Sequence, residues 1–102
     1  MSVVVVATII PVPEHRDEVI AAFTATIAGV HGEAGCELYA LHEADDRLVM
    51  IEKWASQEAL DTHSAGPALR ELGARLKGKT AGRLDVQVLR PHPAGTEEQG
   101  AL

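Results

Sequence analysis

The stretch GCELYALHEADDRLVMIEKW, residues 35–54, predicts a β-hairpin. Its arms run from about Cys36 to Glu43 and from Arg47 to Trp54, and Ala44-Asp45-Asp46 between them supplies the turn. Side chains alternate between the two faces of a strand. One face of the second arm therefore carries Leu48, Met50, Glu52 and Trp54, and the other carries Val49, Ile51 and Lys53. The only Trp of the chain thus ends a strand.

On the N-terminal side of this hairpin, residues 3–10 form a continuous β-branched run that is apolar on both faces. Such a run is typical of a central strand covered on both sides, and Pro11 and Pro13 end it. From Glu14 onward the period becomes helical. Apolar residues then recur at spacings of three and four, at Val19, Ile20, Phe23, Ile27 and Val30, which predicts an amphipathic helix that fades at Gly29 and Gly32.

On the C-terminal side, Ser56 is a natural N-cap for a short helix that carries Leu60 and His63 and breaks near Gly66. Pro67 suits the first position of another helix, whose apolar stripe is Leu69, Leu72 and Leu76. The alternating segment RLDVQVLR, residues 83–90, predicts a fourth strand. The order βαββαβ predicts an α+β, ferredoxin-like fold, with a four-stranded antiparallel sheet and helices on one face.

A chain of 102 residues is long enough for one domain. We expect residues 1–90 to form it and residues 91–102, which lack periodicity, to be a mobile C-terminal tail. The second face of the predicted sheet is rich in apolar residues and has no helices left to cover it. This pattern predicts a homodimer in which a second copy covers that face.

The formal net charge of −6 and the pI near 5.2 argue against nucleic acid and anionic membranes as partners. No stretch approaches the roughly 20 apolar residues of a membrane span, and the apolar run near the N-terminus lacks a basic flank, so we expect neither an anchor nor a signal peptide. Cys36 is the only cysteine, which excludes an intramolecular disulfide and makes a cytoplasmic location the default.

No motif for a phosphate group, a metal ion or a catalytic nucleophile is present in the sequence. We therefore expect neither a cofactor nor a metal.

Two motifs of the chain resemble those of the antibiotic biosynthesis monooxygenase (ABM) family of small dimeric α+β-barrel proteins. They are AGCELYALHEADD, residues 34–46, and EKWASQEALDTH, residues 52–63, followed by SAGPAL at residues 64–69. The resemblance covers about residues 3–90 and implies the fold. Tyr39, His42, Glu52, Trp54 and His63 occupy positions typical of the family.

The chain also departs from the family pattern. Where the family often has SPHF, this chain has Gly66-Pro67-Ala68-Leu69, so a His and an aromatic ring that line the pocket are absent. The three positions characteristic of the haem-degrading branch hold Thr8, His63 and Gly73 here. Because the axial His is missing, we do not expect haem degradation.

The resemblance implies a cofactor-independent monooxygenase that oxidises an electron-rich quinol- or anthrone-like aromatic substrate with O₂. Two alternatives remain: a non-catalytic ligand-binding or stress-related dimer that has lost the chemistry, and an acid–base isomerase in the same cavity.

In the first hypothesis His63 is the catalytic base, since a His that titrates near neutral pH suits deprotonation of a phenol. Trp54, Tyr39, His42, Phe23 and Leu69 are the candidate substrate-binding residues. Tyr39 and His42 must point to opposite faces of their strand, and the sequence does not say which of them faces the cavity.

Each of these candidates also has a structural interpretation. Trp54 could be a packing anchor, and His63 a helix histidine bonded to a backbone carbonyl. For Glu52 we expect pairing with Arg83, Arg90 or the partner subunit, because an unpaired carboxylate in a central strand is costly. Cys36 is expected to be a small buried apolar residue.

Overall fold

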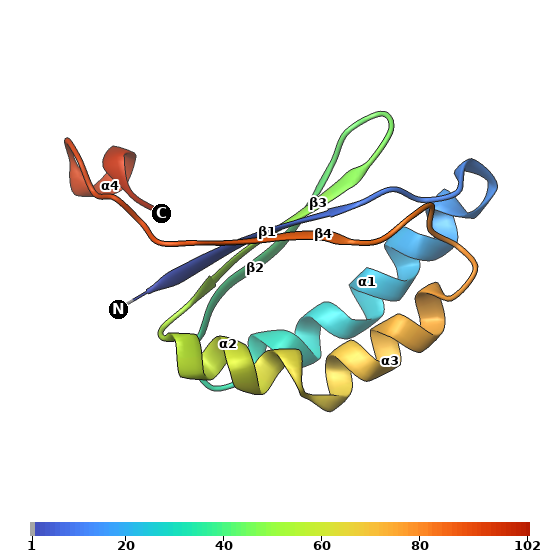
Figure 1. Ribbon diagram of the computed structural model, residues 1–102, viewed down its shortest axis with the longest axis horizontal. Coiled ribbons are helices and arrows are strands. Elements are labelled where there is room, and N and C mark those ends of the chain that lie inside the picture. Colours follow the sequence, from blue (N-terminus) through green and yellow to red (C-terminus); the bar gives the residue numbers. More distant parts are fainter. Residues whose placement is uncertain (1) are drawn as a thin grey trace.

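The computed structural model describes residues 2–102. Its elements follow the predicted order βαββαβ, with the second helix in two pieces (Figure 1). The strands are β1 (Val3–Ile9), β2 (Cys36–Glu43), β3 (Leu48–Trp54) and β4 (Asp85–Leu89). The helices are α1 (Arg16–His31), which follows a 3₁₀ turn at Pro13–His15, then α2 (Gln57–Ser64), α3 (Pro67–Leu76) and a short α4 (Glu97–Gly100).

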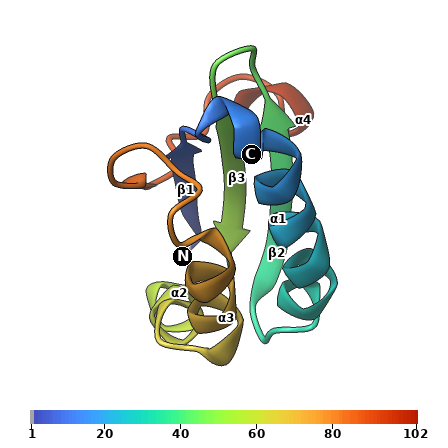
Figure 2. The same cartoon turned by 90° about the vertical axis from the view of Figure 1, so that its right-hand side faces the viewer.

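The four strands form one antiparallel sheet in the order β2-β3-β1-β4. Val3 pairs with Trp54 and Ile9 with Leu48, so β1 and β3 match along their whole length at the centre of the sheet. All three long helices lie on one face of the sheet, with α1 running beside β2 and α3 packed against α1 (Figures 1 and 2). This arrangement confirms the predicted ferredoxin-like α+β fold.

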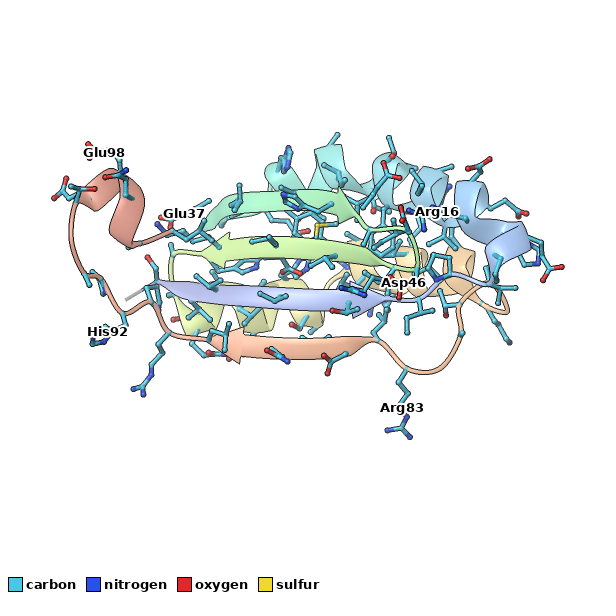
Figure 3. All side chains as sticks on the ribbon, turned by 90° about the horizontal axis from the view of Figure 1, so that it is seen from above. Arg16, Glu37, Asp46, Arg83, His92 and Glu98 are labelled. Carbon is cyan, nitrogen blue, oxygen red and sulfur yellow. The ribbon has the colours of Figure 1, made fainter. Side chains whose placement is uncertain are left out.

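The two central strands alternate strictly between buried and partly buried residues. The buried set faces the helices and consists of Val3, Val5, Ala7, Ile9, Leu48, Met50, Glu52 and Trp54. The opposite face includes Val4, Val6, Val49 and Ile51, which are only partly buried, and within residues 2–102 no helix covers it (Figure 3). The expectation that β1 is covered on both sides is therefore met on one side only.

Local signals fix the helix ends as the sequence predicts. The hydroxyl of Ser56 accepts a hydrogen bond from the backbone N–H of Ala59 at 3.1 Å, which caps α2. Pro67 opens α3, where its missing N–H costs nothing. The break between the two helices lies at Ala65 and Gly66, which lets α3 turn against α1.

The edge strand β4 pairs only with β1, and all five of its residues are exposed. Val86 pairs with Ala7 and Val88 with Val5, so both lie on the helix side of the sheet, yet each is more than 50% exposed. The tail after β4 contains the helix α4, which the sequence did not predict and which stands away from the helical layer (Figure 1). Within residues 2–102, every helix is too short or too polar to span a bilayer.

The turn between α1 and β2 requires a glycine. Gly35 has φ of +81°, a conformation that L side chains rarely adopt, and its carbonyl accepts a hydrogen bond from the N–H of Ala55 at 2.8 Å. A Cβ at Gly35 would lie 2.6 Å from the Cβ of Ala59 on α2. The missing side chain therefore lets this turn lie directly against α2.

We predict that Gly35→Ala destabilises the fold more than Gly78→Ala. Both positions have a positive φ, which costs an alanine about 1 kcal/mol, but a Cβ at Gly78 meets nothing within 4 Å. The additional clash at Gly35 should bring its total loss to about 2–4 kcal/mol. Urea unfolding of the two variants beside the wild type measures this difference, and equal losses would show that the close contact with Ala59 carries no energy.

Candidate functional site

A cavity of about 150 Å³ lies between the sheet and the helices. We call it the inner cavity. Its walls are mostly apolar and include Val5, Phe23, Leu60, Leu69, Leu72 and Val86. Its polar side chains are Tyr39, Glu52, His63 and Ser64. An apolar hollow with a few convergent polar groups is the usual form of a small-molecule site.

His63 is the histidine of the inner cavity. It lies in the last turn of α2 and is only 3% exposed. Its Nδ1 lies 2.9 Å from a carboxylate oxygen of Glu33, so its partner is a side chain and not the backbone carbonyl considered for a structural histidine. Trp54 stacks on the imidazole with ring centroids 4.5 Å apart, and the Tyr39 ring meets it edge-on at 5.4 Å.

Trp54 lies behind His63 and not in the wall of the inner cavity. It is fully buried, and its Nε1–H donates a hydrogen bond of 2.9 Å to a carboxylate oxygen of Glu52. The structure therefore places Trp54 as an anchor that joins the end of β3 to α2. Trp54 was also a candidate for substrate contact, but the imidazole of His63 covers the face of its ring, and Trp54 is not among the residues that line the inner cavity.

The structure separates Tyr39 from His42. Tyr39 is 4% exposed and lines the inner cavity. His42 is exposed on the other face of β2, where its Nδ1 lies 3.1 Å from the carbonyl oxygen of Ala40. Strand alternation puts the two side chains on opposite faces, and the structure shows that His42 is the one that lies away from the inner cavity. Phe23 and Leu69 do line it.

Within the described chain, the hydrogen-bond partner of Glu52 is neither of the two arginines that we considered for it. Arg83 points outward from the β4 side of the sheet (Figure 3), and the hydrogen bond to Glu52 comes instead from Trp54. Burial raises the pKa of the Glu52 carboxyl above its usual value, although the hydrogen bond from Trp54 and the charge of His63 act in the opposite direction. Glu52 is therefore protonated more readily than an exposed glutamate.

Burial also raises the pKa of the Tyr39 phenol and of the Cys36 thiol, and the charges of Glu33 and Glu52 add to both shifts. Tyr39 consequently stays protonated at neutral pH and can donate a hydrogen bond inside the inner cavity. Cys36 lacks the lowered pKa of a reactive thiolate, in line with its expected role as a small, mainly apolar residue.

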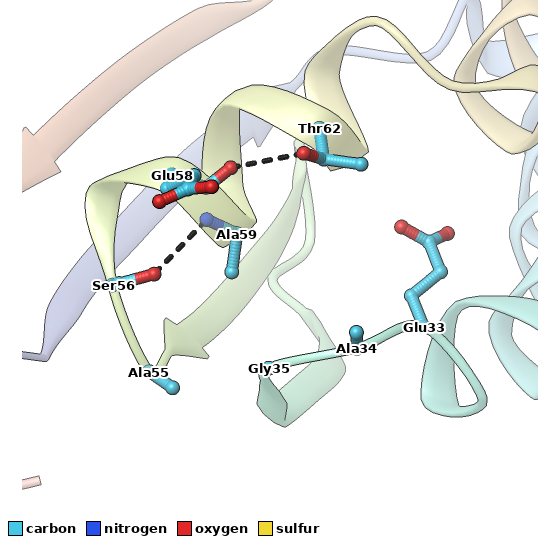
Figure 4. Close-up of a pocket in the computed structure, with 8 residues that line it drawn as sticks. All are labelled: Glu33, Ala34, Gly35, Ala55, Ser56, Glu58, Ala59 and Thr62. Carbon is cyan, nitrogen blue, oxygen red and sulfur yellow. Dashed lines mark hydrogen bonds between the residues drawn. The ribbon is translucent and has the colours of Figure 1, made fainter.

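Glu33 is the site residue that sequence reasoning missed. It precedes the Gly35 turn and lies 30 residues from His63, so no local spacing links the two. Glu33 also lines a second hollow of about 410 Å³ on the molecular surface, which we call the outer groove (Figure 4). The other residues of the outer groove are Ala34, Gly35, Ala55, Ser56, Glu58, Ala59 and Thr62. Glu33 thus connects His63 to a solvent-exposed surface.

Within residues 2–102, no three His, Cys, Asp or Glu side chains lie close enough together to hold a metal ion.

We predict that Glu52→Gln becomes more stable relative to the wild type as the pH rises. A carboxyl whose folded-state pKa is raised contributes stability below its unfolded pKa, near 4.5, and loses that contribution as the pH rises through the folded value. Glutamine stays neutral and can still accept the hydrogen bond of Trp54. Urea unfolding at pH 5 and pH 8 gives the free-energy difference between the two proteins, which should shift toward the variant at pH 8.

Glu14→Gln, at an exposed position, is the control for the change in net charge. The same difference at both pH values for Glu52→Gln would contradict the assigned direction of the pKa shift.

Comparison with known proteins extends this description. Residues 2–75 match the family described as antibiotic biosynthesis monooxygenase. The Mycobacterium tuberculosis protein named "Putative monooxygenase Rv0793" is 33% identical over 91 residues, which cover 87% of this chain and 90% of that protein.

Solved structures show the same likeness. The structure of Rv0793 superimposes with a TM-score of 0.86 at 30% identity and covers 94% of this chain and 100% of its own. A Caulobacter crescentus protein, described as a putative antibiotic biosynthesis monooxygenase, gives a TM-score of 0.81 at 27% identity and covers 86% of this chain and 87% of its own. The match of the family to about three quarters of the chain, together with the relative that is 33% identical, shows that this chain belongs to the antibiotic biosynthesis monooxygenase family.

Proposed function

We propose that this protein is a cofactor-independent monooxygenase that oxidises a small, electron-rich aromatic substrate of the quinol or anthrone class with O₂. The observation that carries the proposal is the position of His63, a buried imidazole that borders an apolar cavity and is hydrogen-bonded to a carboxylate on its other side. Membership of a monooxygenase family supports the reaction type. The single cysteine is consistent with a cytoplasmic location.

The size of the inner cavity favours a single oxidised ring. Its volume is about 150 Å³, and an apolar cavity of about that volume in another protein holds one benzene molecule. A tricyclic anthrone would have to extend past the half-exposed side chains of Leu84 and Val86. We therefore favour a monocyclic quinol as the substrate.

The proposed reaction begins with proton transfer from the substrate hydroxyl or activated C–H group to His63. The resulting anion reduces O₂ by one electron, and the substrate radical and superoxide then combine to form a C–O bond. The peroxide takes the proton back from His63, and loss of water leaves a carbonyl, so that one oxygen atom enters the substrate and the other leaves as water. The protonated Tyr39 can donate a hydrogen bond to the substrate oxygen, and the apolar walls limit access of water.

We further propose that the protein acts as a homodimer joined through the helix-free face of the sheet. That face contains Val4, Val6, Val49 and Ile51 on the central strands, and Leu89 on β4 is 44% exposed. An apolar sheet face of this kind is stabilised when a second copy covers it.

The first prediction from the proposed function is substrate-dependent O₂ uptake that requires His63. Purified protein should consume O₂ with one or more members of a panel of hydroquinones and anthrones, and His63→Ala should lower kcat by about 100-fold or more. His15→Ala is the matched control, because the side chain of His15 lies at the surface and bonds only to Glu18 among the described residues. An oxygen electrode gives both rates.

Unchanged uptake in His63→Ala would remove His63 as the base. If no compound gives uptake above its autoxidation blank, the monooxygenase proposal fails. Calorimetric titration with the same panel then identifies a binding protein, and product analysis without O₂ consumption identifies an isomerase.

The second prediction concerns substrate size. Leu69→Ala enlarges the inner cavity and should raise kcat/KM for a tricyclic over a monocyclic substrate by about 10-fold. Leu76→Ala is the control, because Leu76 is 6% exposed on the same helix but does not line the inner cavity. It should lose at least as much stability, about 2–4 kcal/mol, with no change in substrate preference. Equal preferences in the two variants would show that the inner cavity does not select the substrate.

The third prediction is that sedimentation equilibrium gives twice the chain mass of 10.8 kDa. Ile51→Arg places a charge on the helix-free face and should shift the equilibrium toward monomer by 10-fold or more, while Glu98→Arg in the tail should not. A monomeric wild type at micromolar concentration would contradict the dimer.

A further inference from the structure

A carboxylate outside the inner cavity holds the imidazole inside it. Glu33 lies in the turn between α1 and β2, and its carboxylate oxygen is 2.9 Å from Nδ1 of His63. The side chain of His63 is 2% exposed, whereas that of Glu33 is 28% exposed and lines the outer groove. The inner cavity and the outer groove share no lining residue, so this hydrogen bond joins two separate spaces.

The chemistry of the two groups decides where the proton of the neutral imidazole lies. An ionised carboxylate only accepts hydrogen bonds, so the ring nitrogen that faces it must carry the proton. In a neutral imidazole the other nitrogen, Nε2, is then the acceptor. Among the described residues the contact with Glu33 is the only hydrogen bond of the His63 ring. Nε2 therefore has no protein partner there, and the residue lines the inner cavity.

We propose that Glu33 is the positioning residue of His63: its carboxylate keeps the proton of the neutral ring on Nδ1 and leaves Nε2 free to act as the base. The same carboxylate offsets the positive charge of the imidazolium after it takes up the substrate proton. Trp54 and Tyr39 hold the ring by packing alone. The hydrogen bond with Glu33 is therefore the contact that decides which ring nitrogen carries the proton. This inference rests on the proposed function, because the base is useful only to a reaction that begins with proton removal.

Glu52 does not serve the same role, although it lines the inner cavity and Glu33 does not. Its carboxylate accepts a hydrogen bond from Trp54 and makes none with His63. Burial also raises its pKa, while Glu33 remains in contact with solvent in the outer groove. The two carboxyl groups thus have different environments, and only Glu33 has the geometry to fix the tautomer.

Glu33→Gln tests the proposal, because an amide can either accept from Nδ1–H or donate to a bare Nδ1 and so no longer fixes the tautomer. Nitrogen-15 NMR of the neutral imidazole should show Nδ1–H in the wild type and a mixture of tautomers in the variant. The kcat for O₂ uptake should fall at least about 10-fold with little change in KM. Glu33→Asp, which keeps the charge but shortens the reach, should fall between the two.

Glu58→Gln is the matched control. Glu58 also lines the outer groove, from α2 (Figure 4). The hydrogen bond of the His63 ring goes to Glu33 and not to Glu58. It should leave both the tautomer and kcat unchanged. An Nε2–H tautomer in the wild type, or a tautomer that Glu33→Gln does not alter, would overturn the proposal. If the wild type turns over no substrate, the function fails, while the NMR comparison still decides the role of Glu33.

Discussion

The stack of Trp54 on His63 is the contact on which the rest of the site depends. It joins the last residue of β3 to the last turn of α2 with ring centroids 4.5 Å apart. Each ring also carries a polar group that needs a partner inside an apolar layer, because an unpaired buried polar group costs about 1–3 kcal/mol. Glu52 supplies that partner for the indole, and Glu33 supplies it for the imidazole. Packing and hydrogen bonding therefore fix the same two rings.

The hydrogen bond between His63 and Glu33 in turn depends on how closely the α1–β2 turn approaches α2. Gly35 lies against Ala59, and its carbonyl is bonded to Ala55, which brings the neighbouring Glu33 within reach of α2. A bulkier turn would move the carboxylate away from Nδ1. Since the hydrogen bond requires a separation below about 3.2 Å, a displacement of about 1 Å would break it. The conformation of one glycine thus supports the hydrogen bond of a residue 28 positions later.

The sequence predicted the fold well because the fold rests on local patterns. Strand alternation, the Ser56 cap and Pro67 are all visible in short windows, and the structure confirms each of them. Strand alternation also placed Glu52 and Trp54 on one face. The prediction nevertheless assigned Glu52 to an arginine or to the partner subunit, because it did not treat the neighbouring indole as a donor. The pair of Glu33 and His63 could not be predicted in this way, because it forms only when the turn before β2 packs against α2. Nor did the sequence order of the motifs reveal that the imidazole would cover the face of Trp54.

The single tryptophan has a further consequence for this molecule. Because the chain contains one Trp, the indole part of its near-ultraviolet absorption and emission arises from one known place. That indole is fully buried, stacks on His63 and donates to Glu52, so a change in the charge of either group alters the electric field on the chromophore. The native protein thus contains an optical reporter of the ionisation of its own site, one ring away from the place where the substrate proton would be received.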